Sequence, residues 1–236
     1  MNIVGLQKMT LLDYPGKVAC TVFLGGCNFR CPFCHNSQLL DGSAEPVMEM
    51  QELLAFLEKR KGLLDGVCIT GGEPTLQKDL PALLAAIKAM GFAVKLDTNG
   101  YRPEILKELV GKGLVDYVAM DVKNCPERYA ETAGVPNLEL SRVEESLAFL
   151  LSGRVAYELR TSVAEPLHDE KAMAEICGWI QKISPRNRVP RFFIQPFVDR
   201  DTVIFAGLKA PEKPKLLEFQ RLLAPCAQEV TLRGDL

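Results

Sequence analysis

Three thiols share the spacing C-x3-C-x2-C within the stretch Gly25-Gly26-Cys27-Asn28-Phe29-Arg30-Cys31-Pro32-Phe33-Cys34-His35-Asn36. Soft thiolate ligands select zinc, copper(I) or iron–sulfur clusters. A structural zinc site closes with four ligands, and this loop offers three good ones, since His35 directly follows Cys34 and is awkwardly placed to bind the same ion. The spacing also differs from the C-x2-C-x2-C-x3-C run of bacterial ferredoxins. A [4Fe–4S] cluster held by three cysteines keeps one iron open for chemistry, so the loop at 25–36 predicts a catalytic cluster.

The same thiols leave a structural alternative open, namely a zinc knuckle or a rubredoxin-like iron site. Either would need a fourth ligand, and the nearby candidate, Cys20, lies inside an apolar run at 18–24 that predicts a strand. Eight cysteines in a chain without an export signal favour a reducing compartment and metal chemistry over disulfides. The remaining cysteines are expected to be core or surface thiols: Cys68, Cys125, Cys177 and Cys226.

The composition is that of an ordinary globular protein. The 236 residues, 47% hydrophobic and 25% charged, predict a single domain over residues 1–236 with a full core. A net charge of -2 and a pI near 5.8 give no electrostatic footprint for nucleic acid. No apolar run approaches the roughly 20 residues that cross a bilayer, and the N-terminus lacks a signal-peptide pattern. We therefore expect a cytoplasmic protein that binds neither nucleic acid nor membrane.

Short apolar runs alternate with amphipathic segments along the chain. Alternation of this kind implies an α/β fold with a parallel sheet and right-handed crossovers. Six strand–helix units are too few for a closed eight-fold barrel, so we predict a partial (β/α)6 TIM-like barrel. A long loop is expected at 124–137. Strands are expected at 18–24, 66–70, 92–97, 115–120, 155–163, 191–195 and 229–232, and helices at 45–60, 76–90, 103–111, 138–151, 168–182 and 212–223.

Polar, glycine-bearing motifs follow four successive predicted strands. The cysteines follow the first strand, Gly71-Gly72-Glu73-Pro74 the second, Asp97-Thr98-Asn99-Gly100 the third and Asp121-Val122-Lys123 the fourth. The carboxyl ends of barrel strands form the active face. The four motifs therefore predict one shared site.

Individual residues within these motifs suggest specific tasks, each with a plainer alternative. A Gly-Gly pair lets backbone carbonyls approach a bound ammonium group, although alone it is only a turn signal. Two carboxylates, Asp97 and Asp121, are unfavourable neighbours unless a cation or donor compensates them, while Asp97 and Asn99 are also good turn residues. Arg160 and Gln195 end short apolar runs at the predicted active rim and are candidates to contact a nucleoside or a partner peptide. His168 is expected at the surface, where it opens a helix.

The motifs together resemble the radical S-adenosylmethionine (radical SAM) enzymes. Three sequence segments resemble the activating enzymes of glycyl-radical proteins: Asp13-Tyr14-Pro15-Gly16-Lys17, Gly25-Gly26-Cys27-Asn28 and Cys34-His35-Asn36. Within that group the chain is most similar to the anaerobic ribonucleoside-triphosphate reductase activating proteins, relatives of pyruvate formate-lyase activating enzyme. The three later strand-end motifs extend the resemblance, which covers about half of the chain and is weak after Arg160.

The resemblance implies a [4Fe–4S] cluster on Cys27, Cys31 and Cys34 and S-adenosylmethionine (SAM) on its open iron. One electron from the reduced cluster would cleave SAM into methionine and a 5′-deoxyadenosyl radical. The implied SAM contacts are Phe33 with the adenine, the Gly71-Gly72-Glu73 segment with the amino group, and Lys123 with the carboxylate. By likeness to pyruvate formate-lyase activating enzyme, Na+ or K+ would bind a candidate site at Asp97, Thr98 and Asp121. Three further expected cofactor-binding residues are Asn99, Arg160 and Gln195.

The implied activity is abstraction of the α-hydrogen from one glycine of a partner, which stores a glycyl radical there. Two partners are expected. One is a glycyl-radical enzyme, namely anaerobic ribonucleotide reductase, and the other is an external one-electron donor such as flavodoxin or ferredoxin. Two alternatives stay open at this stage. One is a radical SAM enzyme acting on a small molecule in cofactor or modified-nucleoside synthesis. The other is a non-catalytic iron–sulfur or zinc-binding protein.

Overall fold

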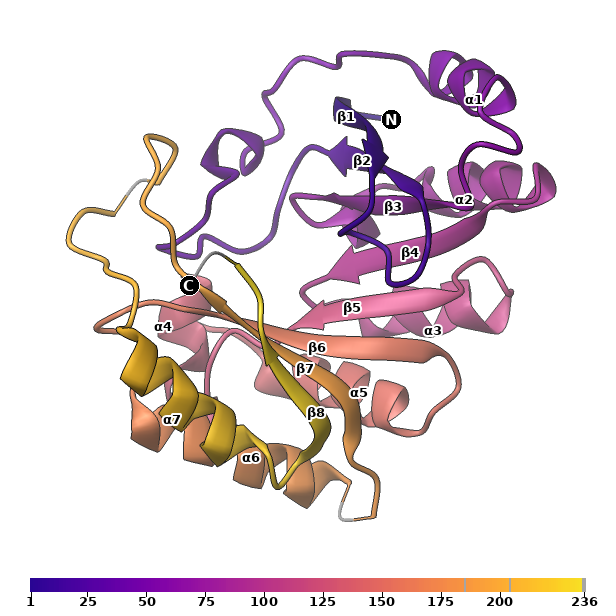
Figure 1. Ribbon diagram of the computed structural model, residues 1–236. Coiled ribbons are helices and arrows are strands. Elements are labelled where there is room, and N and C mark those ends of the chain that lie inside the picture. The colour runs from indigo at the N-terminus through magenta and orange to yellow at the C-terminus, as the bar shows by residue number, and fades with distance from the viewer. Residues whose placement is uncertain (185, 204, 235–236) are drawn as a thin grey trace. The chain divides into compact units, whose positions relative to one another are not determined.

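A computed structural model describes residues 1–184, 186–203 and 205–234 (Figure 1). It has an α/β fold whose strands follow one another in chain order in an eight-stranded sheet. The β2–β3, β3–β4, β6–β7 and β7–β8 pairs are parallel, and β1 runs antiparallel to β2. The strands are β1 Ile3–Thr10, β2 Ala19–Leu24, β3 Gly66–Gly71, β4 Ala93–Thr98, β5 Tyr117–Asp121, β6 Ala156–Val163, β7 Val189–Pro196 and β8 Ala227–Leu232.

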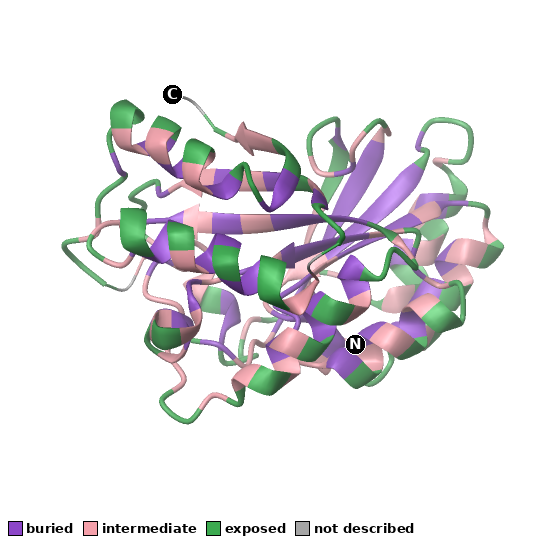
Figure 2. Ribbon diagram, turned by 90° about the horizontal axis from the view of Figure 1, so that it is seen from below, coloured by how far each residue is buried: buried purple, intermediate pink, exposed green. Residues whose placement is uncertain are grey.

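Helices occupy most of the segments between these strands. Figure 2 shows buried residues along the strands and exposed residues on the outer faces of the helices. No helix within the described part of the chain is both long and apolar enough to cross a membrane. The α-helices are α1 Met50–Glu58, α2 Leu80–Ala89, α3 Pro103–Gly111, α4 Tyr129–Ala133, α5 Leu140–Leu151, α6 Glu170–Ile183 and α7 Lys213–Leu223, and the 3-10 turns are Ser37–Leu39, Pro74–Leu76 and Pro126–Arg128.

The chain forms two compact units. The first comprises Met1–Asn28, Gln38–Thr98 and Glu104–Val118, and the second comprises Phe29–Ser37, Asn99–Pro103 and Ala119–Leu236. A single domain over 1–236 stays a prediction. In the first unit α2 packs on β4 and on α1, and in the second α6 packs on α5 and α7 (Figure 1).

Strand β2 explains how the sheet positions the cysteine loop. Five of its six residues are buried, which is typical of a parallel strand covered on both faces. It pairs with β3 in a continuous register from Ala19 opposite Gly66 to Leu24 opposite Gly71. The ends of both strands therefore deliver the cysteine loop and the Gly-Gly segment to the same edge of the sheet.

Strand β1 was not expected from the sequence. It is an edge strand whose exposed residues follow no strict alternation, so the period of two that marks a half-buried strand is absent. Gly5 interrupts its apolar residues and lies against Phe23, where an added Cβ would come within 3.3 Å of that side chain. Gly5 thus allows close packing of β1 on β2. Because it also interrupts the apolar pattern, the sequence did not predict this strand.

Several helix limits differ from the prediction. Helix α1 begins at Met50 after a capping box between Glu49 and Glu52, not at residue 45. The loop predicted at 124–137 contains the turn Pro126–Arg128 and helix α4. Five residues are too few to show a helical period, although Gly134 at φ 65° closes α4 in the way helix-ending glycines do. The strand and helix assignments elsewhere are confirmed within a few residues, and α3 has the predicted limits.

Candidate functional site

The start of the cysteine loop is fixed by backbone hydrogen bonds within the first unit. The N–H of Gly26 donates to the Leu39 carbonyl at 2.6 Å, and that of Cys27 donates to the Leu40 carbonyl at 3.0 Å. The Gln77 side-chain amide donates to the Gly25 carbonyl at 2.7 Å. Cys27 is thus held at a defined position after β2.

The Gly71-Gly72 pair brings the segment after β3 against this start. The N–H of Gly72 donates to the Leu24 carbonyl, and the N–H of Glu73 donates to the Gly26 carbonyl, each at 2.8 Å. A Cβ on Gly72 would come within 2.1 Å of the Gly26 carbonyl oxygen, closer than real Cβ contacts occur. Glycine at 72 therefore has a packing reason in addition to the ligand role that the sequence predicts.

The Glu73 carboxylate links this segment to the end of β4. It is 1% exposed and accepts hydrogen bonds from the Thr75 hydroxyl at 2.5 Å and from the Thr98 hydroxyl at 2.8 Å. A buried carboxylate needs such donors, because its charge is costly without them. Glu73 and Thr98, both predicted at the site, are therefore brought together directly.

Asp97 forms an ion pair with Lys95 on the same strand. The Lys95 side chain is 1% exposed, and the Cys68 thiol lies 3.7 Å from a carboxylate oxygen of Asp97. The charge of Asp97 is thus compensated by a buried lysine that the sequence analysis missed. The sequence Ala-Val-Lys-Leu-Asp contains one indication of this buried lysine, because it places a lysine within an otherwise apolar strand.

The second half of the cysteine loop belongs to the second unit. The N–H of Cys34 donates to the Cys31 carbonyl at 3.1 Å, and that of Arg30 donates to the Ala133 carbonyl at the end of α4 at 2.8 Å. Phe33 is 6% exposed and packs with Ala164. Phe33 therefore anchors the loop, while its predicted contact with adenine stays a prediction.

A charged triad joins the end of β5 to the middle of β6 in the second unit. The Arg160 guanidinium donates to one oxygen of Asp121 at 2.8 Å, and the Lys123 ammonium donates to the other at 3.0 Å. Burial alone would raise the pKa of the Asp121 carboxyl, but Arg160 and Lys123 hold it well below its usual range. Burial lowers the pKa of the Lys123 ammonium, and the opposing attraction of Asp121 raises it above its usual value. Arg160 and Lys123, predicted separately, thus meet on one carboxylate.

The triad yields a pH prediction. An Asp121→Asn variant should unfold at lower denaturant than wild type by an amount that stays constant between about pH 5 and pH 9. The folded-state pKa of Asp121 is depressed, so its stabilisation is present above the unfolded value of about 3.9 and is lost as the pH falls below it. Urea titrations at several pH values test this, and a difference that persists undiminished at about pH 2 would contradict it.

The remaining predicted residues occupy less connected positions. Asn99 is buried and its side chain accepts from the N–H of Tyr101 at 3.0 Å, as in a turn, while its predicted cofactor contact stays a prediction. Gln195 lies near the end of β7 opposite Ser162 of β6. The expectation of a surface position for His168 is wrong, because the residue is completely buried.

The cysteines divide into two groups. The five outside the loop, Cys20, Cys68, Cys125, Cys177 and Cys226, are all buried, so the four that were expected to be core or surface thiols lie in the core. The three loop cysteines are partly exposed, and none of the eight, all of which the structure describes, forms a disulfide. Exposed, unbridged thiols on a short loop are a donor set that fits an iron–sulfur cluster.

Binding of a cluster would have to draw the three loop thiols closer together. Within the described residues, no three His, Cys, Asp or Glu side chains lie close enough together to hold an ion. Burial raises the pKa of the Cys31 thiol to about 11, although the Lys123 ammonium acts in the opposite direction. Ligand thiols must lose their protons. Cluster assembly at neutral pH would therefore release a proton from Cys31.

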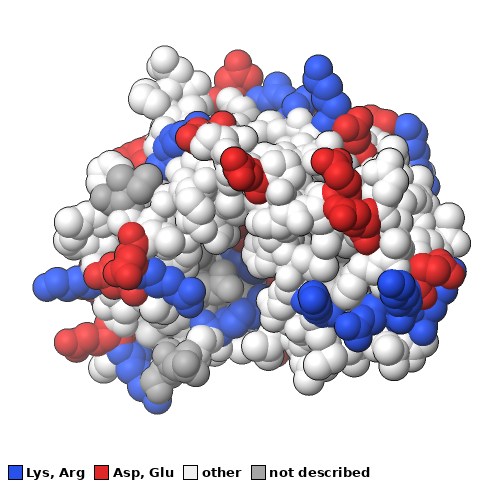
Figure 3. Space-filling model, turned by 90° about the horizontal axis from the view of Figure 1, so that it is seen from above, with Lys and Arg blue, Asp and Glu red and all other residues white. Residues whose placement is uncertain are grey.

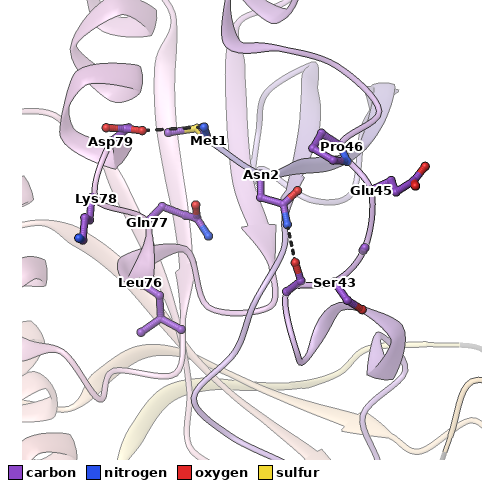
Figure 4. Close-up of a pocket in the computed structure, with 11 residues that line it drawn as sticks. Met1, Asn2, Ser43, Glu45, Pro46, Leu76, Gln77, Lys78 and Asp79 are labelled. Carbon is purple, nitrogen blue, oxygen red and sulfur yellow. Dashed lines mark hydrogen bonds and ion pairs between the residues drawn. The ribbon is translucent and has the colours of Figure 1, made fainter.

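Two surface features complete the description. A cavity of about 620 Å³ in the first unit lies beside residues 42–46 and 76–79, where Gln77 also reaches the cysteine loop (Figure 4). Its lining combines both charges, from Glu45, Lys78 and Asp79, with apolar Pro46. The molecular face in Figure 3 likewise carries basic and acidic side chains among uncharged residues.

Comparison with known proteins places the chain in a family. The model of the Radical SAM superfamily matches residues 21–152. A protein of Methanocaldococcus jannaschii, named as a candidate glycyl-radical enzyme activating enzyme, is 30% identical over 98% of this chain and 95% of its own length. Pyruvate formate-lyase-activating enzyme of Clostridium pasteurianum is 34% identical, with 52% of each chain covered.

A solved structure agrees with the fold. A domain of pyruvate-formate lyase-activating enzyme from Bacteroides vulgatus superposes with a TM-score of 0.59 at 20% identity, covering 72% of this chain and 99% of that one. The predicted α/β fold of the radical SAM type, a partial TIM-like barrel, is thereby confirmed. Membership implies a [4Fe–4S] cluster and SAM as cofactors. The chain belongs to the radical SAM superfamily.

Proposed function

We propose that this protein is a radical SAM activase that installs a glycyl radical on a partner enzyme, anaerobic ribonucleoside-triphosphate reductase. The observation that carries the proposal is the 30% identity to the activating-enzyme relative over 98% of this chain and 95% of that protein. The likeness to pyruvate formate-lyase-activating enzyme supports the same activity class. The choice of ribonucleotide reductase as the partner rests on the sequence resemblance in the motifs that include Asp13-Tyr14-Pro15-Gly16-Lys17.

The proposal gives each site residue a task. Cys27, Cys31 and Cys34 hold the cluster. The carbonyls of Gly71 and Gly72 accept hydrogen bonds from the SAM ammonium, since the N–H groups of Gly72 and Glu73 already donate to protein carbonyls. Lys123 serves the SAM carboxylate and Phe33 the adenine, and Arg160 and Gln195 serve the partner peptide or nucleoside.

The chemistry is a transfer of one hydrogen atom. When bound, the reduced cluster supplies the electron that cleaves SAM and generates the 5′-deoxyadenosyl radical. The hydrogen passes from a glycine α-carbon of the partner to C5′, which gives 5′-deoxyadenosine and a glycyl radical. An external donor such as flavodoxin or ferredoxin supplies the electron.

The proposed Na+ or K+ site includes two carboxylates that are ion-paired in this structure. Lys95 pairs with Asp97, and Lys123 and Arg160 pair with Asp121. Protein cations therefore already compensate both carboxylates. A metal ion at Asp97, Thr98 and Asp121 stays a prediction from the resemblance.

Electron paramagnetic resonance tests the activase proposal. The protein is reconstituted anaerobically with iron and sulfide, reduced, and mixed with SAM and anaerobic ribonucleotide reductase. We expect a glycyl doublet on the reductase, and no doublet on a reductase whose radical-bearing glycine is replaced by alanine. SAM cleavage without a doublet on any candidate glycyl-radical protein would overturn the proposal and favour a small-molecule substrate.

A further inference from the structure

His168 connects two segments of the second unit that carry site residues. Its side chain is completely buried, although it lies just before α6. Its Nε2 atom lies 2.8 Å from the Lys123 carbonyl oxygen, and its Nδ1 atom lies 3.2 Å from both the backbone N and the carbonyl oxygen of Ala164. We assign the neutral tautomer with the proton on Nε2, because that ring nitrogen then donates to Lys123 and Nδ1 accepts from the Ala164 N–H.

The imidazole ring also faces the cysteine loop. The centroids of the His168 and Phe33 rings lie 6.0 Å apart, at an interplanar angle of 54°. Phe33 lies between Cys31 and Cys34 in the sequence. Phe33 also packs on Ala164, whose backbone N–H donates to the His168 Nδ1 atom. One buried side chain thus contacts both the cysteine loop and the main chain that presents Lys123.

Asn124 joins the same two strand-end segments independently. Its side-chain amide donates to the Leu167 carbonyl at 2.9 Å and to the Thr132 hydroxyl at 2.8 Å, and it is completely buried. These two hydrogen bonds involve neither Lys123 nor Phe33. The Asn124 side chain therefore fastens these loops through Leu167 and Thr132, with no hydrogen bond to Lys123, which makes it a matched control for His168.

We infer that His168 is a positioning residue that fixes the Lys123 backbone relative to Phe33 and the cysteine loop, and thereby sets where the Lys123–Asp121 ion pair stands relative to the bound cofactor. The inference rests on the part of the proposed function in which Lys123 serves the SAM carboxylate. It adds a residue that no sequence motif marks, because the side chain acts through a carbonyl and a ring contact. A purely structural histidine would instead affect folding alone.

Variants that separate the two ring nitrogens test the inference. The side-chain amide nitrogen that His168→Gln introduces reaches the position of Nε2, whereas the shorter side chain in His168→Asn reaches only that of Nδ1. Loss of one positioned hydrogen bond should raise the dissociation constant of SAM about tenfold in His168→Asn. His168→Gln should restore most of that affinity, and Asn124→Ser should stay within about twofold of wild type despite reduced stability.

Binding is measured by equilibrium dialysis of SAM on the reconstituted protein, with urea unfolding and the paramagnetic spectrum of the reduced cluster with SAM as parallel readouts. Equal loss of affinity in His168→Asn and Asn124→Ser, or no recovery in His168→Gln, would overturn the inference. No partner protein is needed, so SAM affinity that follows this order while no glycyl doublet forms would leave the inference standing and reject the activase proposal.

Nitrogen-15 resonances of His168 in the wild-type protein provide a measurement that does not depend on a variant's folding. Burial lowers the pKa of the His168 imidazole. We expect a proton on Nε2 and an unprotonated Nδ1 at neutral pH. An Nε2 atom without a proton would contradict donation to the Lys123 carbonyl and overturn the inference.

Discussion

A Cys31→Ala variant is expected to fold, to hold no intact [4Fe–4S] cluster and to cleave SAM at no more than the background rate. The prediction follows from the loop's supply of three ligands, because two thiols cannot hold the cluster with one open iron. Cys31 is partly exposed, so its truncation should change the free energy of unfolding by about 1 kcal/mol or less.

Iron and sulfide content, 5′-deoxyadenosine formation and urea unfolding together check this variant. Cys177→Ala is the matched control, since Cys177 is a buried thiol on α6 outside the loop. The control should lose about 1 kcal/mol of stability and keep the cluster. Full SAM cleavage by Cys31→Ala would contradict the catalytic role of the loop.

A Gly72→Ala variant is expected to lose most of its cluster and activity without touching any cluster ligand. The added Cβ would come within 2.1 Å of the Gly26 carbonyl oxygen and within 3.3 Å of the Cys27 N. Both neighbours are backbone, so the start of the cysteine loop must move. Overpacking of this kind costs about 1–3 kcal/mol, occasionally more.

Gly178→Ala provides the contrast for this second variant. Gly178 lies within α6, and nothing stands within 4 Å of an added Cβ. Alanine in a helix should stabilise the protein by about 0.5–1 kcal/mol and leave the iron content unchanged. An unchanged iron content in Gly72→Ala would show that the contact between the two segments does not position the cluster ligands.

The fold was predictable where a pattern is local and repeated. Alternating apolar runs and amphipathic segments located β2 to β8 and the longer helices, because both periods extend over several residues. Strand β1 and helix α4 were not predicted, and each has a physical reason. The edge strand lacks alternating burial, and α4 has five residues, with its end marked only by Gly134.

The site was predictable to the level of motifs but not of contacts. Strand ends located Glu73, Asp97 and Asp121, since carboxyl ends of parallel strands share one edge. Lys95 was missed because the sequence does not show that it is buried beside Asp97, and His168 was missed because its partner is a backbone carbonyl distant in sequence. Only the folded chain shows that a lysine or histidine is buried, and burial is what demands a partner.

Transfer of deuterium from the partner's glycine tests the central claim most directly. Anaerobic ribonucleotide reductase is prepared with α-deuterated glycine, and 5′-deoxyadenosine formed during activation is analysed by mass spectrometry. The activase account predicts deuterium in 5′-deoxyadenosine together with a glycyl doublet on the reductase. 5′-Deoxyadenosine that forms without deuterium, while the reductase stays free of radical, would contradict it.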